Sequence, residues 1–237
     1  MKEIIVVFDK LHLKKLISEE IKSNGLNCDL NHIDVSNIAN MEGLFYGSNF
    51  NGDISEWNTS NVKNMVSMFG TSIFNGDISN WDVSNVENMN SMFSNSQFNG
   101  DISKWDTSSV KYMQGMFEIS IFNGDVSKWN VSNVECMHLM FSQSQFNGDI
   151  CSWNVSKAET MYGMFSYSNF DKDLSDWKPY KVDTFENTFM ESHCTIPYWA
   201  NYENIEIRRK AIDSYVLNKE LNKQLHQNNK IIQKIKI

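Results

Sequence analysis

A 24-residue block repeats along most of this 237-residue chain and limits its possible folds more than any other feature. The copy starting at Phe50 reads FNGDISEWNTSNVKNMVSMFGTSI, and further copies start every 24 residues from Phe74 to Phe170. A degenerate copy at Leu26 brings the number to seven. A fixed period of this length is typical of a solenoid, in which each coil buries its apolar face only against its neighbours. We therefore expect one continuous array of coils rather than domains separated by a cleft.

The repeat divides the chain into three parts. Residues 1–25 are expected to form an N-terminal cap, with a short strand over 3–8 and a helix between Asp9 and Gly25. Residues 26–193 form the repeat solenoid, and residues 194–237 form a C-terminal helical cap and tail. Apolar residues within 205–225 have the spacing of an amphipathic helix that would seal the last coil. Both caps are expected because terminal coils otherwise expose apolar faces.

Residues 24 apart stack on one another in such an array, so each repeat position can be followed as a column. The Phe, Ile and Trp columns that begin at Phe50, Ile54 and Trp57 predict an interior of stacked apolar side chains. Val, Met, Met and Phe at spacings of 3, 3 and 1 from Val62 predict a short helix, and Ile-Ser-x-Trp-x-Val/Thr predicts a short strand. The expected fold class is α/β: a right-handed solenoid with a parallel sheet on one side and helices on the other.

Two polar columns also run through all seven coils, one of Asp and one of Ser. Asn-Gly-Asp is a turn sequence, in which Gly would supply a positive φ and the Asp carboxylate would accept backbone N–H bonds. We favour this structural role and predict no cofactor. The alternative is a column of divalent cations, although each coil offers one firm carboxylate while Ca²⁺ takes six to eight oxygens. That alternative would use Asp53, Asp77, Asp101, Asp125 and Asp149.

The formal charge of −8 is unevenly distributed. Residues 1–25 carry five Lys against four acidic residues, and residues 195–237 carry eight Lys or Arg against four. The repeat block therefore holds −13, a charge that repels nucleic acid. We predict no nucleic-acid partner. No apolar stretch is long enough to cross a membrane, and the apolar run before Asp9 is too short for the core of a signal peptide.

No group of residues suggests an enzyme. The four cysteines fall in different columns and form no CxxC pair, so we expect thiols rather than a disulfide framework. The five histidines never fall in register with one another or with a repeated nucleophile.

Exposed positions that vary from coil to coil are the better candidates for function. The residues on either side of each Trp vary in this way, and solenoids bind partners on their sheet face. We predict that another protein binds there, through Glu56, Asn58, Asn80, Asp82, Lys104, Asp106, Lys128 and Asn130.

The string GDIS-x-W-(N/D)-(V/T)-S-N-V-x-x-M-x-x-M-F resembles the repeats of the BspA-like leucine-rich repeat family of bacterial surface proteins. The resemblance covers residues 26 to about 192. It implies a fold akin to leucine-rich repeats and, for some members, adhesion to host matrix proteins or other cells. It also implies a cell-surface or secreted location, whereas the chain shows no signal peptide, which leaves the cytoplasm open. The predicted function is a non-catalytic protein-interaction module, adhesin-like or scaffolding. The alternative is a cation- or surface-binding ladder built on the Asp and Ser columns.

Overall fold

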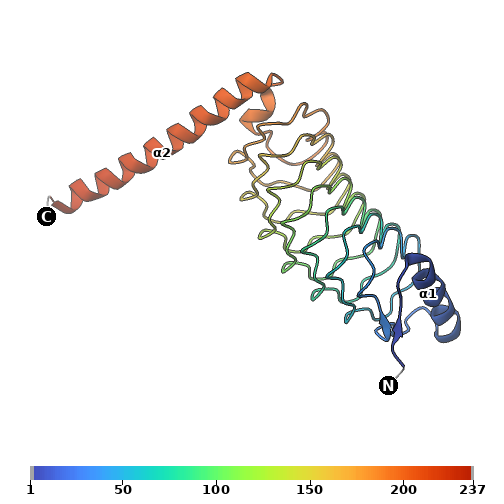
Figure 1. Ribbon diagram of the computed structural model, residues 1–237. Helices are drawn as coiled ribbons and strands as arrows, with labels where there is room; N and C mark the ends of the chain where they lie inside the picture. The colour runs from blue at the N-terminus through green and yellow to red at the C-terminus, as the bar shows by residue number, and fades with distance from the viewer. Residues whose placement is uncertain (1–2, 236–237) are drawn as a thin grey trace.

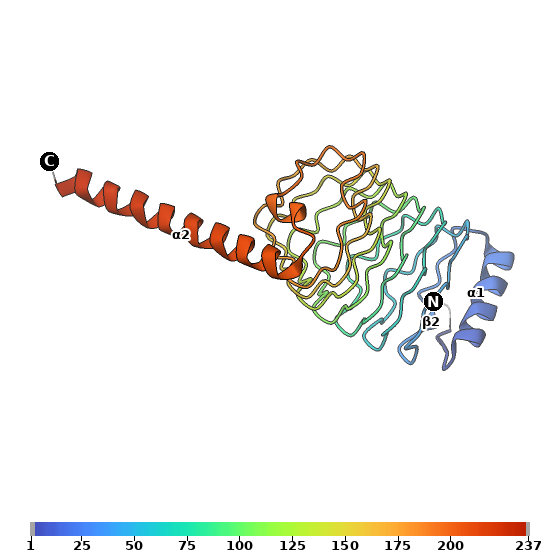
Figure 2. The same ribbon diagram turned by 90° about the horizontal axis from the view of Figure 1, so that it is seen from above.

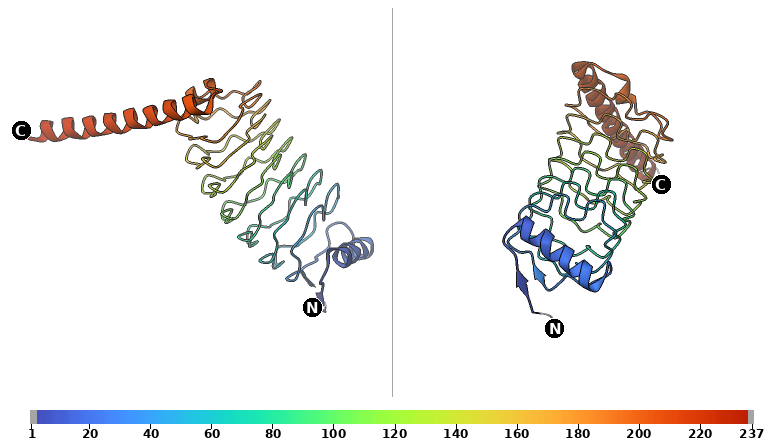
Figure 3. Two further views of the ribbon diagram at one scale, coloured as in Figure 1. Left: turned by 45° about the horizontal axis from the view of Figure 1, so that its top comes forward. Right: turned by 90° about the vertical axis from the view of Figure 1, so that its right-hand side faces the viewer.

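The computed structural model describes the backbone of residues 3–235 and shows a stack of coils between two helical ends (Figure 1). Strand β1 (Ile5–Val6) pairs in parallel with strand β2 (Ile33–Asp34), and helix α1 (Lys10–Asn24) lies between them in sequence. The chain then winds through successive coils to the 3₁₀ helix η1 (Tyr198–Asn201) and helix α2 (Ile205–Ile235) (Figures 2 and 3). We call residues 26–193 the coil stack. Its right-handedness and its kinship with leucine-rich repeats stay predictions.

Backbone hydrogen bonds between neighbouring coils hold the stack in a 24-residue register. Single parallel β-bridges join equivalent residues of successive coils, from Asn40–Asn64 to Cys136–Thr160. The amides of residues 65, 67, 69 and 71 each donate to a carbonyl 23 residues further along, over 2.7–2.9 Å. The amides of residues 68, 70 and 72, in contrast, donate within the coil to the carbonyl three residues back. Every second amide in this segment is therefore directed along the stack.

The short helix predicted from the Val-x-x-Met-x-x-Met-Phe pattern is wrong. These residues form consecutive turns, and the backbone enters the left-handed region at Ser67 (φ 51°) and again at Thr71 (φ 57°). An α-helix would direct its amides to carbonyls four residues back, which would leave none for the neighbouring coil. The turns still bury Met65, Met68 and Phe69 completely, so the apolar spacing fits both conformations.

The strand predicted around each Trp is also wrong. Residues 55–56 lie in a turn, closed by a 3.2 Å bond from the Trp57 amide to the Ile54 carbonyl. The Ile54 carbonyl also accepts from the indole Nε1 of Trp81 in the next coil, over 3.0 Å. The inter-coil bridges lie mainly along the Asn40–Thr160 column, with one more between Asp29 and Asp53. The expected parallel sheet beside the Trp column is therefore absent from the described residues.

Aromatic side chains fill the interior of the stack as ladders. In the Phe50 column, rings of neighbouring coils stack with centroids 6.2–6.4 Å apart. A second Phe column lies beside it, with Phe69 and Phe74 4.4 Å apart. The Trp57 and Trp81 rings stack at 6.3 Å, and each Trp of the column from Trp57 to Trp177 donates its Nε1 proton to the preceding coil. Buried polar donors in this core are thereby paired, as burial requires.

The glycine of each Asn-Gly-Asp turn is needed for space and not for a positive φ, which corrects the sequence interpretation. None of Gly52, Gly76, Gly100, Gly124 and Gly148 has φ in the left-handed region. A Cβ atom at Gly52 would lie 2.1 Å from the Cys28 carbonyl oxygen, and at the other four it would lie 2.8–2.9 Å from the preceding Phe ring. The Phe ladder therefore packs directly against these turns.

The N-terminal end matches the helix expected between Asp9 and Gly25. The Asp9 carboxylate accepts a 2.8 Å bond from the His12 amide, and Gly25 ends α1 with φ 87°. Leu13 and Ile17 are buried, so the apolar face of α1 covers the first coil.

The C-terminal end is closed by two residues that we did not predict. Trp199 of η1 continues the Trp ladder, stacking on Trp177 at 6.5 Å and donating its Nε1 proton to the Leu174 carbonyl over 2.9 Å. Arg208 of α2 is completely buried, and its guanidinium lies 4.4 Å from the Phe185 ring centroid. It donates to the backbone carbonyls of Tyr202, Val182 and Glu203.

Helix α2 seals the last coil with its first turns only. Arg208 and Ile212 are buried and Val216 is partly buried, whereas every side chain described from Leu217 to Lys230 is exposed. Figures 1 and 2 show the helix leaving the stack and extending away from it. The expectation that residues 205–225 cover the last coil is therefore correct for about half of that segment. The helix also continues through the predicted tail to Ile235, while residues 236–237 lie outside the described part.

Replacing Ile119 by Gly should cost less stability than replacing an equally exposed Ile whose φ is negative. Ile119 has φ 53°, a conformation that costs an L-residue about 1–2 kcal/mol, and Gly adopts it without that penalty. We expect Ile119→Gly to be more stable than its control by about 1–2 kcal/mol, measured by urea unfolding, since both variants lose the same side chain and carry the same entropic cost of Gly. Ile73→Gly is the matched control, since Ile73 is equally exposed (46% against 47%) and has no positive φ. Equal losses in the two variants would contradict the argument.

Replacing Arg208 by Met should destabilise the C-terminal cap. The side-chain stem is retained, but three carbonyls lose a charged donor, which costs at least ~2 kcal/mol. The neighbouring exposed Arg209, with one 3.3 Å bond to Tyr180, gives the control Arg209→Met. Thermal melting and amide hydrogen exchange around Trp199 should show the loss for Arg208→Met alone; similar melting of the two variants would disprove the capping role.

Candidate functional site: two exposed surfaces of the coil stack

The Asp column holds the turns. In all seven coils one carboxylate oxygen accepts the backbone N–H two residues further on, over 2.8–3.0 Å: Asp29, Asp53, Asp77, Asp101, Asp125, Asp149 and Asp173. This bond is the main cause that lowers the pKa of the five carboxyls from Asp53 to Asp149, and the Ser175 hydroxyl is the main cause that lowers the pKa of Asp173. These hydrogen bonds offset the repulsion between stacked like charges.

The Ser column holds a second set of turns. The Ser72 hydroxyl donates to the Phe69 carbonyl over 2.8 Å, and the Ser96 hydroxyl accepts the Phe98 amide over 3.0 Å. Both serines are buried. The Ser72 and Ser96 hydroxyls are thus engaged within the core, whereas the Asp carboxylates are exposed and use one oxygen each in their turns. Among the described residues no group of three or more His, Cys, Asp or Glu side chains is arranged to hold a metal ion.

An Asn column that we did not single out makes similar bonds between coils. The side-chain oxygen of Asn51 accepts the Asn75 amide of the next coil over 2.8 Å, and the pattern continues through Asn75, Asn99 and Asn123. The signal was present in the sequence as an Asn repeated before each Gly, but a turn role explained it equally well.

The predicted partner-binding residues beside the Trp column are all exposed: Glu56, Asn58, Asn80, Asp82, Lys104, Asp106, Lys128 and Asn130. The structure divides them into two sets. The residue after each Trp stabilises a local turn through its side-chain oxygen. The Asn58 oxygen, for example, accepts hydrogen bonds from the amide and the hydroxyl of Ser60, over 3.1 and 2.7 Å. The residues before Trp form no side-chain hydrogen bond within the described part of the chain. We call the latter set (Glu56, Asn80, Lys104 and Lys128) the Trp-flank row.

A hollow of 410 Å³ lies at the C-terminal end of the Trp column, between the last coils. Ser152, Asn154, Asp176, Lys178 and Tyr180 are among its lining residues, and none of the predicted residues reaches it. Asp176 is also ion-paired there with Lys219 of α2.

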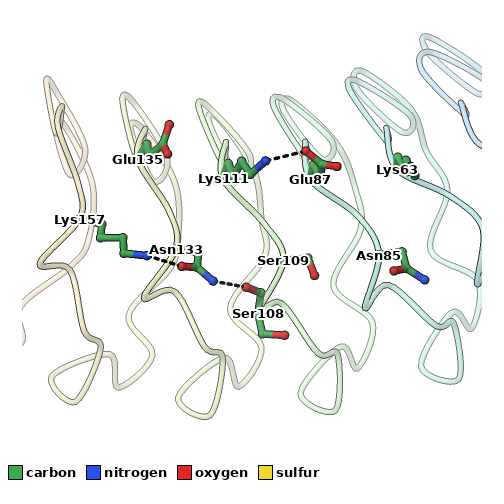
Figure 4. A pocket seen from close by; sticks show the side chains of 9 residues that line it. All are labelled: Lys63, Asn85, Glu87, Ser108, Ser109, Lys111, Asn133, Glu135 and Lys157. Atoms are coloured by element: carbon green, nitrogen blue, oxygen red, sulfur yellow. Dashed lines mark hydrogen bonds and ion pairs between the residues drawn. The ribbon is translucent and has the colours of Figure 1, made fainter.

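A larger hollow of 480 Å³ crosses five successive coils on a different side of the stack, and we did not predict it. We call it the charged groove. Figure 4 shows one charged residue per coil along it, in the order Lys63, Glu87, Lys111 and Glu135. The sequence signal was available: this column alternates in sign over Lys63, Glu87, Lys111 and Glu135, before Glu159 and Asp183 continue it as acidic residues, while the Asp column never changes sign.

Few of the charges in the charged groove are neutralised within the chain. Lys111 and Glu87 form an ion pair at 2.8 Å, which raises the pKa of Lys111 and lowers that of Glu87. Lys63 and Glu135 form no ion pair in the described structure, and the Lys157 ammonium donates to the neutral Asn133 side chain over 2.6 Å. The groove therefore offers charges of both signs in a fixed order.

Burial shifts the pKa of three cysteines and one histidine toward the uncharged form. Burial is the main cause that raises the pKa of Cys151 and Cys194 to about 11, which keeps both thiols protonated at neutral pH. No disulfide joins the four cysteines. His138 packs on the Tyr162 ring at 4.9 Å, and burial lowers its pKa.

The comparisons with known proteins identify a family. A protein-family model described as "Mycoplasma protein of unknown function, DUF285" matches residues 13–120 and again residues 95–201, together most of the chain. The chain belongs to this family. The DUF285 family is a repeat family, which agrees at that level with the resemblance stated above. Its description carries no function. No curated protein and no solved structure matches the chain. Within the described residues, no helix has both the length and the apolar character to cross a bilayer.

Acid should destabilise the protein through the Asp column. A carboxyl with a lowered pKa contributes stability above its unfolded pKa of about 3.8, and this contribution is lost as the pH falls through the lower folded value. We expect the urea midpoint to hold from pH 7 to about 5 and to fall below pH 4. The double variant Asp101→Asn, Asp125→Asn retains the acceptor oxygens without titrating, so its midpoint should fall less. Identical acid profiles of variant and wild type would show that these turns are not responsible.

Proposed function

We propose that this DUF285 protein is a non-catalytic protein-interaction module and that the charged groove binds an extended segment of another protein. The supporting observation is the concave run of charges of both signs across five coils, from Lys63 to Lys157. Four steps between coils at about 4.8 Å give a length of about 19 Å, which matches about six residues of an extended chain.

The chemistry of the charged groove favours a polar peptide. Its lining consists of Lys, Glu, Asn and Ser side chains. A peptide with alternating acidic and basic residues would complement the row from Lys63 to Glu135, and such patterns select partners more strongly than they raise affinity. An apolar small molecule would find no apolar lining here.

The finer features of the proposal rest on the sequence. The BspA-like resemblance of the repeat supports a leucine-rich-repeat-like architecture and an adhesin-like or scaffolding role, at the cell surface or inside the cell. The cation-ladder alternative is less well supported, because one oxygen of each Asp already accepts a hydrogen bond from its own turn and no group of three or more His, Cys, Asp or Glu among the described residues is arranged to hold a metal ion.

Charge substitutions can decide which surface binds. We would select binders from a display library of short random peptides, and screen a panel of extracellular-matrix proteins in parallel. The variant Glu87→Ala, Lys111→Ala should weaken selected binders at least about tenfold, which corresponds to 1.4 kcal/mol. The Trp-flank row supplies the matched variant Lys104→Ala, Lys128→Ala, which should bind as the wild type does.

Two outcomes of this binding experiment would contradict the proposal. Loss of binding only in the Lys104, Lys128 variant would move the interface to the Trp-flank row and refute the groove. Selection of no binder, with no matrix protein retained, would contradict the interaction function itself. Thermal melting of both variants should match the wild type, because none of the four side chains is buried.

A further inference from the structure

One wall of the charged groove contains Asn side chains that bond the coils to one another. Asn61, Asn85 and Asn133 occupy the same repeat position, and each donates a side-chain N–H to a Ser carbonyl 25 residues earlier, over 2.7–2.8 Å. We call these three residues the Asn61 ladder. Asn85 and Asn133 line the groove, so the ladder is part of the surface that a bound peptide would meet.

The Asn61 ladder is interrupted in the middle of the groove. Ser109 occupies this position in the third of the five coils that line the groove. An Asn there would reach the backbone carbonyl of Ser84, which accepts no hydrogen bond within the described part of the chain. The Ser109 hydroxyl also forms no hydrogen bond among the described residues, and Figure 4 shows it beside the groove without a partner. The interruption therefore leaves one acceptor and one donor unused.

A second interruption is filled by the chain itself. Lys157 occupies the same repeat position two coils further on, and its ammonium donates to the Asn133 side-chain oxygen over 2.6 Å. The Asn133 carboxamide is therefore used at both ends, because its N–H also donates to the Ser108 carbonyl (Figure 4). Ser109 has a shorter side chain than Asn or Lys and fills its place with neither. The place at Ser109 is thus open to a group from another molecule.

The charges around Ser109 favour a neutral group. Lys111, two residues away, is already ion-paired with Glu87 at 2.8 Å. Lys63 and Glu135 line the groove in the coils beyond this pair. A cationic side chain would have to displace the Lys111 ammonium from Glu87, and an anionic one would have to compete with Glu87 for Lys111. A neutral group that donates and accepts hydrogen bonds leaves this ion pair intact.

A carboxamide has the required chemistry. Its NH₂ group donates and its oxygen accepts, which complements the Ser84 carbonyl and the Ser109 hydroxyl. The chain itself uses this group for the same purpose at Asn85 and Asn133, in the coils on either side. A carboxamide from a partner would continue the Asn61 ladder across the gap.

We propose that the charged groove recognises an Asn or Gln side chain of its partner, whose carboxamide occupies the gap at Ser109. This inference rests on the peptide-binding function proposed above and names the residue type that the groove selects. It also gives the groove a register. Lys63 and Lys111 carry the same charge two coils apart, as do Glu87 and Glu135, so the charges alone would allow a peptide to shift by two coils. The single gap allows one position.

Replacing Ser109 by Asn supplies the missing carboxamide from the chain itself. The melting temperature should rise by about 2–4 °C, the shift expected for one added hydrogen bond in a chain of this length. Peptides selected on the wild type from the random display library should share an Asn or Gln. They should bind Ser109→Asn at least about tenfold more weakly, because the gap is filled.

Two controls accompany this variant. Ser152→Asn makes the same exchange at an exposed position outside the groove, in a column where Asn80 already stands, and should change neither melting nor binding. Exchange of the shared Asn or Gln of the peptide for Leu should weaken binding to the wild type about tenfold and have little effect on binding to Ser109→Asn.

The results separate this inference from the peptide-binding function. Binders that depend on Glu87 and Lys111 but share no Asn or Gln would support the groove and refute the carboxamide site. A shared Arg or Lys in its place, equal binding by Ser109→Asn, or an unchanged melting temperature of this variant would also refute it. Selection of no binder would refute the peptide-binding function and this inference together.

Discussion

The hydrogen bonds between coils are the constraint on which the rest of this structure depends. Every second amide of the segment from residue 65 to residue 71 donates to the next coil, and those bonds form only if each coil has the same length. Equal length places residues 24 apart directly over one another. The Phe, Ile and Trp ladders follow, because a side chain that is buried in one coil is buried in the next.

The same constraint explains which features could be predicted from the sequence. The interior columns were predictable, since repetition within one chain marks Phe50, Ile54 and Trp57 as core positions. The local conformation was not, because apolar residues at spacings of 3, 3 and 1 face inward both in a helix and in turns with left-handed residues such as Ser67 and Thr71. Only the hydrogen bonds to the neighbouring coil decide between the helix and the turns. The sequence of a single repeat does not indicate those bonds. Likewise, Gly52 is required by the nearness of the Cys28 carbonyl and the Phe50 ring, which no turn propensity reveals.

The two ends differ in how far their sequence predicts their structure. Helix α1 begins with an Asp cap and ends at a Gly, and its apolar spacing identifies the buried face. At the other end, a run of Arg208, Arg209 and Lys210 reads as a solvated basic face, yet Arg208 is completely buried. Its burial depends on three backbone carbonyls that converge only after the last coil, η1 and α2 have come together. The burial of Arg208 therefore depends on the folded C-terminal end as a whole, and no short stretch of the sequence indicates it.

The arrangement of charge separates structural from functional positions better than net charge does. Stacked like charges repel across one coil spacing, so a column of a single sign persists only where something stabilises it. The Asp column has such a stabiliser in the N–H donors of its own turns, and repetition there reflects structure. In the column from Lys63 to Glu135 no turn depends on the side chains, and the alternating sign avoids the repulsion that the Asp column must offset. Glu159 and Asp183 continue this column with the same sign as Glu135, so the alternation is confined to the coils that line the charged groove.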